Sequence, residues 1–315
     1  MINKKVIITG GAGFIGSNLA ENLSKNYKEV IIIDNLYTGK IENIKDIIEN
    51  KNVKFIKGSI SDINLLKNTF KKTDYIFHLA AIASVSKSIK DPIQTIDVNV
   101  NGTLNVLLAA KQNNVKKVIF SSSCAVYGNP NYFPIDEAAE TKPLSPYAAS
   151  KLIGEYYCDF FSKKFNLSTI SLRYFNIYGP KQDPENEYAA VIPKFICRVI
   201  NNKSPIINGN GEQTRDFTYV NDVIKANILA AKSKSNGFYN IGYGKKLSVN
   251  SLAELILKIF NKKIQVKHNK PLIGEIQNSQ ANIKKAEDTI KYKPKYSLEE
   301  GLKETCDWFL KNSKK

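Results

Sequence analysis

A glycine-rich segment, residues 9–16, places the strongest constraint on how this chain folds. It reads TGGAGFIG between a short apolar run and a segment of helical period, and it satisfies G-x-G-x-x-G from Gly11 and G-x-x-G-x-x-G from Gly10. Glycines at a strand-to-helix turn let the backbone approach a pyrophosphate, whose charge then faces the free N–H groups of the helix N-terminus. The segment predicts a dinucleotide-binding βαβ unit, with a glycine-rich turn alone as the alternative.

Short β-branched runs alternate with longer segments of helical period along the first half of the chain. This alternation is typical of βαβ units around a parallel sheet that is buried on both faces. It predicts strands at residues 5–9, 29–34, 53–57, 75–79, 117–121 and 169–174, and helices at residues 14–24, 65–71, 97–113 and 147–165. Together these elements predict an α/β fold with a Rossmann-type doubly wound parallel sheet.

After about residue 176 the alternation gives way to a stretch rich in Pro, Gly and Asn, residues 178–211. We expect a smaller C-terminal α/β lobe that leans over the carboxyl edge of the sheet and binds the substrate. The predicted division is a dinucleotide-binding domain at residues 1–176 and a substrate lobe that takes up most of residues 177–315. Some segments of the second part are expected to return to the sheet.

The formal net charge of +17 raises the question of nucleic-acid binding. Only three arginines occur, Arg173, Arg198 and Arg215, and the remaining excess is lysine scattered singly among Asn and Ile. No basic stripe with interleaved aromatic residues is present in the sequence. We therefore expect a solvated lysine surface that attracts anionic metabolites, and no nucleic-acid partner.

Cysteine spacing and hydropathy exclude other classes. Cys124, Cys158, Cys197 and Cys306 are far apart and show no metal-ligand spacing, so we expect buried thiols and neither a disulfide scaffold nor a metal site. No apolar run approaches the roughly 18 residues of a membrane span. The N-terminus leads directly into a predicted strand without the apolar region of a signal peptide, so we expect a cytoplasmic protein with no membrane partner.

Asp34 ends the second predicted strand, 18 residues after Gly16. A carboxylate at this position can accept hydrogen bonds from both ribose hydroxyls of an adenosine, whereas a 2′-phosphate would meet it as a like charge. Lys40 lies nearby, but no arginine does. Asp34 therefore favours NAD over NADP as the cofactor, and an aspartate that only closes a turn is the alternative.

A second set of residues suggests proton transfer. Ser145 and Pro146 are typical of a helix start, after which Tyr147 and Lys151 lie one turn apart on the same helix face. An ammonium and a cationic nicotinamide close to the phenol would favour the phenolate, which is a usable general base. The serine-rich segment 121–128 follows a predicted strand and places Ser123 at the same edge of the sheet. The alternative is a surface tyrosine–lysine pair.

These motifs together resemble the extended short-chain dehydrogenase/reductase superfamily, and within it the UDP-hexose 4-epimerases, over nearly the whole chain. The resemblance lies in residues 9–16, 78–81, 99–103, 121–128, 147–151, 172–176 and 215–217. It implies a tightly held NAD, a UDP-sugar substrate, a homodimer, and Ser123, Tyr147 and Lys151 as the catalytic residues. The segments 178–184, 188–195 and 207–211 are most similar to epimerases that act on UDP-N-acetylhexosamines.

The resemblance also implies which residues bind each ligand. The cofactor residues are Gly10, Gly13, Phe14, Ile15, Gly16, Asp34, Asn35, Ser59, Ile60, Leu79, Ala80, Ala81, Asn99, Tyr147 and Lys151. The substrate residues are Ser84, Ser123, Tyr147, Asn176, Ala189, Val191, Ile192, Arg215 and Ser279. Three positions depart from the family pattern: Leu272 replaces a diphosphate-binding arginine, Ser59 replaces an aspartate at the adenine, and Asn282 replaces an aspartate.

Two positions bear on the reaction and the sugar. Cys124 and Ala125 stand where related dehydratases and decarboxylases carry acidic residues, which favours epimerisation. In the family, a small residue at the position of Ser279 admits an N-acetyl group beside the sugar C2. The expected reaction is therefore the interconversion of UDP-GlcNAc and UDP-GalNAc, with possible activity on UDP-glucose and UDP-galactose. The alternatives are a UDP-glucose 4-epimerase of galactose metabolism and a non-catalytic NAD-binding regulatory protein.

The resemblance further implies that the homodimer forms through the helices at residues 97–113 and 147–165, which the family pairs into a four-helix bundle. Their outer faces should then be apolar. The candidate surface residues are Leu104, Leu108, Ile153, Tyr157 and Phe161.

Overall fold

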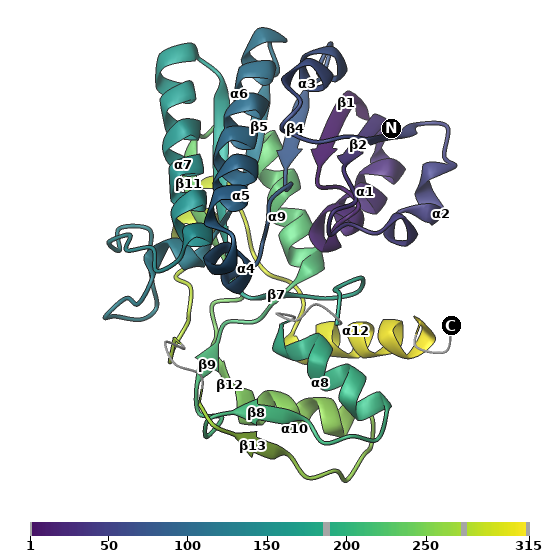
Figure 1. Ribbon diagram of the computed structural model, residues 1–315, viewed down its shortest axis with the longest axis vertical. Helices are drawn as coiled ribbons and strands as arrows, with labels where there is room; N and C mark the ends of the chain where they lie inside the picture. Colours follow the sequence, from purple (N-terminus) through teal and green to yellow (C-terminus); the bar gives the residue numbers. More distant parts are fainter. Residues whose placement is uncertain (1, 185–189, 272–275, 313–315) are drawn as a thin grey trace.

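The computed structural model of the protein describes residues 2–184, 190–271 and 276–312. A parallel sheet with helices on both faces forms the larger lobe, and a smaller lobe of helices and short strands lies beyond one edge of it (Figure 1). The predicted Rossmann-type α/β fold is confirmed.

The main sheet has seven strands in the order β11-β6-β5-β4-β1-β2-β3. All neighbouring strands run parallel. The strands are β1 (Ile2–Thr9), β2 (Tyr27–Asp34), β3 (Val53–Lys57), β4 (Tyr75–His78), β5 (Lys117–Ser123), β6 (Ser168–Tyr174) and β11 (Gly237–Ile241). The strand order reverses between β1 and β4, and ligands of open α/β sheets bind at such a reversal, outside the carboxyl ends of the strands.

Helices cover both faces of this sheet because neighbouring strand residues point to opposite sides. Ile8 packs in the core beneath α1 and α9, whereas Ile7 packs in the core beneath α3, α6 and α7. The helices of the larger lobe are α1 (Phe14–Asn26), η1 (Ile41–Asn43), α2 (Lys45–Ile48), α3 (Ile63–Thr69), α4 (Val85–Lys90), α5 (Pro92–Ile96), η2 (Asp97–Asn101), α6 (Gly102–Gln112), η3 (Cys124–Tyr127), α7 (Pro146–Phe165) and α9 (Val220–Lys232). The helix predicted at residues 97–113 begins earlier, at Pro92, and its middle is a π-helical turn, η2.

The smaller lobe is built from short elements. They are β7 (Ile177–Tyr178), α8 (Val191–Ile200), β8 (Ile206–Asn208), β9 (Thr214–Arg215), β10 (Thr218–Tyr219), β12 (Leu247–Ser248), α10 (Val249–Ile259), β13 (Lys267–Asn269) and α12 (Leu298–Asn312). Its strands pair two by two, and its apolar residues Phe195, Leu252 and Phe309 belong to the same core cluster as Ile8. α9, β11 and α11 (Lys284–Ile290) also follow residue 176 but lie with the layers of the larger lobe, where α11 packs on β11 and α9.

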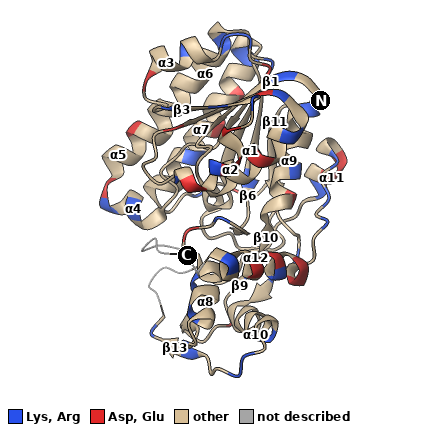
Figure 2. Ribbon diagram, turned by 90° about the vertical axis from the view of Figure 1, so that its right-hand side faces the viewer, with Lys and Arg blue, Asp and Glu red and all other residues tan. Residues whose placement is uncertain are grey.

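Lysine and arginine residues are distributed over the ribbon of both lobes (Figure 2). None of the four cysteines forms a disulfide. Cys158 and Cys306 are buried, but Cys124 and Cys197 are only half-buried, which corrects the expectation that all four are buried. Within the described ranges, no helix is long and apolar enough to cross a membrane.

Candidate functional site

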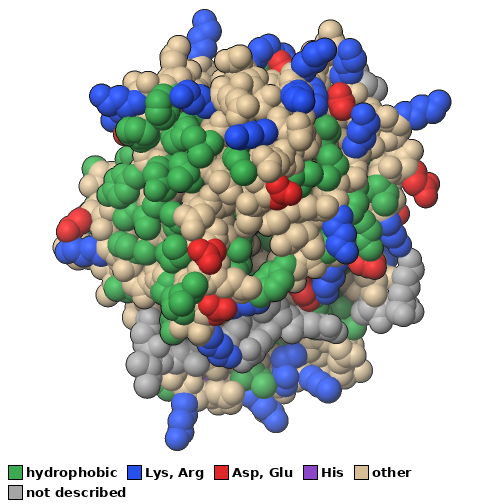
Figure 3. Space-filling model, turned by 45° about the horizontal axis from the view of Figure 1, so that its top comes forward, with side chains coloured by type: hydrophobic (Ala, Val, Ile, Leu, Met, Phe, Trp, Pro, Cys, Tyr) green, Lys and Arg blue, Asp and Glu red, His purple; other side chains and the backbone are tan. Residues whose placement is uncertain are grey.

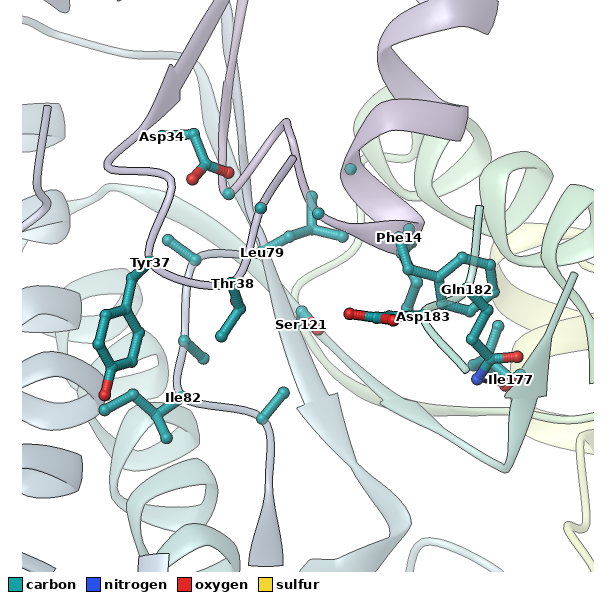
Figure 4. A pocket seen from close by; sticks show the side chains of 18 of the residues that line it. Phe14, Asp34, Tyr37, Thr38, Leu79, Ile82, Ser121, Ile177, Gln182 and Asp183 are labelled. Atoms are coloured by element: carbon teal, nitrogen blue, oxygen red, sulfur yellow. Dashed lines mark hydrogen bonds between the residues drawn. The ribbon is translucent and has the colours of Figure 1, made fainter. Parts of the chain in front are cut away.

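A cavity of about 990 Å³ opens at the carboxyl ends of the strands, where the strand order reverses. Asp34 and Tyr37 lie on one side of it, and Gln182 and Asp183, from the segment after β7, lie on the other (Figure 4). Its wall contains the predicted cofactor residues Gly10, Gly13, Phe14, Ile15, Gly16, Asp34, Asn35, Ser59, Ile60, Leu79, Ala80, Ala81, Tyr147 and Lys151, together with Ser123 and Asn176. The volume is at the upper end of the usual range for ligand pockets.

The glycine loop joins β1 to α1 and fits a pyrophosphate. Gly10 has a φ of +71°, which other residues rarely adopt, and a Cβ at this position would lie 2.6 Å from the backbone nitrogen of Ala80. Backbone conformation and lack of space therefore both exclude a side chain here. α1 starts after Gly13, and no side chain of the described residues caps it. Its first N–H groups are therefore available to a phosphate of a dinucleotide.

Asp34 closes the adenosine side of the cavity. Its carboxylate accepts hydrogen bonds from the backbone N–H groups of Ala12 at 2.9 Å and Leu36 at 2.8 Å, and only 8% of the residue is exposed. The carboxylate therefore holds the glycine loop and the turn after β2 in place. Because each carboxylate oxygen has a second lone pair, Asp34 can still accept ribose hydroxyls, so the geometry fits NAD.

The loop after Asp34 was not predicted as part of the site. The Tyr37 hydroxyl donates to Oε1 of Gln94 at 3.0 Å, and the Lys87 ammonium lies 4.0 Å from the centre of the Tyr37 ring. Lys40 forms an ion pair of 3.1 Å with Asp183 across the cavity mouth. These contacts join residues far apart in sequence and follow no motif, so only the proximity of Lys40 to Asp34 pointed to this loop.

His78 lies behind the cofactor side. Its Nδ1 is 2.8 Å from Oγ1 of Thr9 and its Nε2 is 2.9 Å from Oγ1 of Thr103. Because the Thr103 hydroxyl donates to the Asn99 carbonyl, Thr103 accepts from Nε2–H and Thr9 donates to Nδ1. Burial lowers the pKa of His78 to about 3, so the ring is neutral at pH 7.

Asn99 lies behind the cavity wall rather than in it. Its side chain accepts from the backbone N–H of Ile82 at 2.8 Å and donates to the Ile82 carbonyl and to the Ser150 hydroxyl. The Asn99 side chain therefore fixes the strand-end loop against α7, and its predicted contact with the cofactor stays a prediction.

The three predicted catalytic residues meet at one wall of the cavity. Ser123 is the last residue of β5, two residues beyond the predicted strand end. The Ser145 hydroxyl caps α7 by accepting from the Ala148 N–H at 3.1 Å, and this cap sets the start of the helix that carries Tyr147 and Lys151. The Lys151 ammonium donates to the Ser121 carbonyl at 2.7 Å, which joins α7 to β5.

The pKa of the tyrosine differs from the expectation. Burial raises the pKa of Tyr147 to about 12, and a hydrogen bond from Ser123 opposes this rise. Lys151 is not among the groups that lower the pKa of Tyr147, and burial lowers the pKa of Lys151 itself to about 8. In the chain alone, Ser123 rather than Lys151 therefore favours the phenolate.

Asp216 joins several segments behind Asn176, at the side of the cavity where we expect the sugar to bind. This carboxylate accepts from the N–H groups of Tyr243 at 2.8 Å and of Gly244 and Ala281 at 3.0 Å. Asn176 lines the cavity, and its Nδ2 donates to the Asp216 carbonyl at 3.1 Å and to the Ser279 hydroxyl at 3.3 Å. Burial raises the pKa of Asp216 to about 6. Asp216 was part of a motif in the sequence, but its role as this hub was not predicted.

The other predicted substrate residues lie away from the cavity wall or outside the described residues. Ser84 caps α4 by accepting from the Lys87 N–H at 3.2 Å. Arg215 is half-buried, and its Nη1 donates to the Thr214 carbonyl at 2.9 Å. Val191 and Ile192 begin α8, and Ser279 lies behind Asn176 with 8% exposure. Ala189 and Leu272 lie outside the described residues.

A glycine loop and a Ser-Tyr-Lys set facing one cavity at the edge of a doubly wound sheet define the class of extended short-chain dehydrogenases/reductases. Comparison with protein families narrows this class. The chain belongs to the NAD dependent epimerase/dehydratase family, whose model matches residues 6–242. The family resemblance and NAD as cofactor, both predicted from the sequence, are confirmed.

Individual relatives cover almost the whole chain. The solved UDP-N-acetylglucosamine 4-epimerase of Methanobrevibacter ruminantium, in complex with UDP-N-acetylmuramic acid, is 44% identical, covers 99% of both chains and has a TM-score of 0.96. The UDP-glucose 4-epimerase of Thermotoga maritima, solved with UDP-glucose, is 38% identical with a TM-score of 0.93, covering 98% of this chain and 99% of that one. A UDP-N-acetyl-alpha-D-glucosaminuronate decarboxylase of Bacillus cytotoxicus is 37% identical over 98% of each chain.

Proposed function

We propose that the protein is an NAD-dependent 4-epimerase of UDP-hexoses, with UDP-GlcNAc and UDP-GalNAc as its substrate pair. The observation that carries this proposal is the position of Ser123, Tyr147 and Lys151 on the wall that joins the cofactor side of the cavity to Asn176 on the sugar side. A substrate hydroxyl held there lies beside a proton acceptor and a hydroxyl donor. The named activities of the two similar epimerases support the reaction class.

In the proposed mechanism, Tyr147 takes the proton of the sugar 4-hydroxyl while Ser123 holds O4. NAD, when bound, supplies the acceptor for the C4 hydride and returns it. The sugar becomes a 4-ketone, turns over in the pocket and receives hydrogen on its other face, and Tyr147 then returns the proton to O4. Lys151 would bind the nicotinamide ribose, and the positive charge of the nicotinamide would add to the effect of Ser123 on the phenol.

A decarboxylase is the second candidate because a relative of nearly full length carries that name. The residues after Ser123 argue against it. Cys124 lines the cavity, and burial raises the pKa of its thiol to about 11, so the thiol is neither an acid comparable to a carboxyl group nor a thiolate at pH 7. Epimerisation needs no further acid or base at this position.

The N-acetylated sugar is the finer part of the proposal. Ser279 is small, and it lies directly behind Asn176, so the space beside the sugar is not filled by a large ring. The named activity of the Methanobrevibacter ruminantium relative agrees with this choice. The remaining support is the family expectation that a small residue at this position admits an N-acetyl group.

The experiment incubates the purified protein separately with UDP-GlcNAc and UDP-glucose and resolves the 4-epimers by chromatography. We expect UDP-GalNAc from UDP-GlcNAc. If neither substrate gives an epimer, the proposed 4-epimerase activity is contradicted. Tyr147→Phe is the matched control, because it keeps the ring and removes the proton acceptor. A wild type as inactive as Tyr147→Phe but carrying NAD would support the regulatory alternative.

We also propose a homodimer through α6 and α7. Leu108, Tyr156 and Phe160 are 41%, 63% and 47% exposed, and hydrophobic side chains gather on the left-hand side of Figure 3, where these helices lie. Leu104, Ile153 and Tyr157 are half-buried, but Phe161, predicted as part of this surface, is only 2% exposed and packs in the core beneath α7. Its place on the outer face is taken by its neighbour Phe160.

Light scattering at micromolar concentration tests the dimer. We expect twice the monomer mass for the wild type and the monomer mass for Tyr156→Glu/Phe160→Glu, because two buried carboxylates would oppose an apolar interface. Leu310→Glu, at an exposed apolar residue of α12, is the matched control and should leave the mass unchanged. A monomeric wild type would contradict the proposal.

A further inference from the structure

A buried ion pair lies directly behind the catalytic serine and has no part in the mechanism above. Glu155 of α7 is 5% exposed and Arg173 of β6 is 2% exposed. Arg173 donates from Nε to Oε1 of Glu155 at 2.9 Å and from Nη2 to Oε2 at 2.6 Å, so the pair is bidentate. Because desolvation of both charges offsets their attraction, such a pair is a weak source of stability.

The pair fixes the backbone on both sides of Ser123. Before it, the Ser122 hydroxyl donates to Oε1 of Glu155 at 2.5 Å. After it, the hydroxyl of Tyr127, the last residue of η3, accepts from Nη1 of Arg173 at 2.8 Å, and the guanidinium lies 4.7 Å from the centre of the Tyr127 ring. The only segment between these two anchors is Ser123 and the short turn η3.

The Tyr127 anchor is itself held from the far side. Its hydroxyl donates to Oδ1 of Asn240 on β11 at 2.7 Å, and Nδ2 of Asn240 donates to the Ile135 carbonyl at 2.9 Å. Every hydrogen-bonding role at Tyr127 is thus specified: it accepts from Arg173 and donates to Asn240. The anchor cannot rotate without breaking one of these two bonds.

The pair also connects Ser123 to the catalytic helix. Tyr147, Lys151 and Glu155 lie on successive turns of one face of α7. Lys151 donates to the carbonyl of Ser121, and Glu155 accepts from the hydroxyl of Ser122. Two consecutive residues at the end of β5 are therefore hydrogen-bonded to α7. Ser123 follows immediately and reaches Tyr147 through the hydrogen bond that lowers the pKa of the phenol.

We propose that Glu155 and Arg173 are positioning residues for Ser123, whose hydroxyl they aim at O4 of the substrate and at Tyr147. The inference rests on the proposed epimerase function and deepens it. Three N–H groups of the guanidinium are used at once, two toward Glu155 and one toward Tyr127, and a lysine ammonium has no planar fork with which to do this. Arginine at residue 173 of a lysine-rich chain therefore has a specific geometric role.

A double-mutant cycle with Ser123→Ala tests the proposal. Glu155→Met/Arg173→Met replaces the pair by apolar side chains of similar length and leaves no charge unpaired. We expect kcat for the UDP-hexose to fall about 10- to 100-fold, as for a displaced catalytic group, with the KM and the bound NAD little changed. In the Ser123→Ala background the same change should have almost no further effect on kcat, because the group that it positions is already absent.

A second variant keeps the test decisive if the pair cannot be replaced without loss of folding. Ser122→Ala/Tyr127→Phe leaves the ion pair intact and removes its two contacts with the serine segment, together with the hydrogen bond from the Tyr127 hydroxyl to Asn240. The same direction of change in kcat is expected. For both variants the acid limb of the kcat–pH profile should move to higher pH, because a misplaced Ser123 no longer lowers the pKa of Tyr147.

The matched control is Asp222→Asn at the start of α9. Asp222 is 2% exposed and accepts from the backbone N–H groups of Lys295 and Tyr296 in the smaller lobe. This variant should lose thermal stability without a change in kcat or in the pH profile. A purely structural role of the Glu155–Arg173 pair would make the Met/Met variant behave in the same way.

The proposal is overturned if both test variants keep the wild-type kcat and pH profile, or if Met/Met lowers kcat by the same factor with and without Ser123. A wild type that forms no epimer contradicts the proposed function instead. In that case a crystal structure of the Met/Met variant decides, because the proposal requires the Ser123 hydroxyl to move away from Tyr147. An unchanged serine would then overturn it.

Discussion

The two sides of the cavity are built in opposite ways. On the cofactor side, β1, the glycine loop, α1 and β2 form one continuous stretch of chain that ends at Asp34, and the segments after β3 and β4 and the start of α7 complete the wall. On the sugar side, Asn176, Asp216, Tyr243 and Ala281 come from four separate segments, and hydrogen bonds to Asp216 hold all of them together. Regular elements therefore shape the cofactor site, whereas one buried carboxylate shapes the sugar site.

Two buried titratable groups, His78 on the cofactor side and Asp216 on the sugar side, respond to acid in opposite directions. The pKa of His78 falls to about 3 from 6.5, so stability is lost as the pH falls below 6.5, where the unfolded chain alone takes up a proton. The pKa of Asp216 rises to about 6 from 3.8, so its ionisation costs stability above pH 6, and this cost disappears as the pH falls toward 3.8. Below pH 6.5 we therefore expect His78, on the cofactor side, to lower the free energy of unfolding, whereas Asp216 does not.

The largest expected effect lies at the wall that both sides share. Tyr147→Phe removes the proton acceptor, so kcat should fall by about 100- to 10,000-fold, the usual contribution of general base catalysis. The bound NAD, measured by absorbance after denaturation, should be unchanged, because the glycine loop and Asp34 are intact. Loss of NAD together with activity would show that the two sides are not separable in this way.

Ser279→Tyr should change the sugar side alone. A ring at this buried position, beside Asn176, is expected to occupy the space next to the sugar C2 and to exclude an N-acetyl group while tolerating a hydroxyl. The ratio of kcat/KM for UDP-GlcNAc to that for UDP-glucose should fall by about 10- to 100-fold. An unchanged ratio would remove Ser279 as the determinant of the N-acetylated substrate.

His78→Gln tests the acid sensitivity of the cofactor side. Between pH 7 and pH 5 the wild type should lose about 2 kcal/mol of unfolding free energy through His78, because the folded chain excludes the proton that the unfolded chain binds. The variant should lack this part of the pH dependence in denaturant unfolding. His268→Gln, at the other and exposed histidine, is the control. Equal pH dependence in wild type and His78→Gln would contradict the assignment.

Asp216→Asn is expected to have the smallest effect. The amide keeps the shape of the carboxylate but offers only one oxygen to three backbone N–H donors, so the segment that carries Ser279 should loosen. We expect the KM for the UDP-hexose to rise about tenfold, the cost of one weakened contact, with NAD content unchanged. A lower NAD content with an unchanged KM would show that Asp216 supports the cofactor side rather than the sugar side.

The same contrast explains what could be predicted from the sequence. The six strands of the first half and the helix that carries Tyr147 follow from short-range periodicity and capping, and the structure shows them within a few residues. β11 was not predicted as a strand, because its pairing with β6 is set by contacts across more than sixty residues of sequence. The π-helical turn η2 in the helix of Asn99 has no hydropathy signal.

One surface expectation was wrong, one pKa has a different cause from the one expected, and one loop of the site was not predicted. Phe161 was expected on the outer face of α7 but points into the core. Because α7 carries apolar residues on both faces, the sequence does not show which face packs on the sheet. The group that lowers the pKa of Tyr147 is Ser123, and the Lys151 ammonium donates to the Ser121 carbonyl. The loop with Tyr37 and Lys40 closes the cavity through partners that are distant in sequence.

The most direct test of the central claim follows one atom through the reaction. UDP-GlcNAc carrying deuterium at C4 is incubated with the protein in ordinary water, and the product is analysed by NMR and mass spectrometry. Transfer of the C4 hydride to NAD and its return to the opposite face predict UDP-GalNAc with the deuterium still at C4. An epimer that has lost the deuterium to solvent, or a product that has lost water or carbon dioxide, would contradict the account.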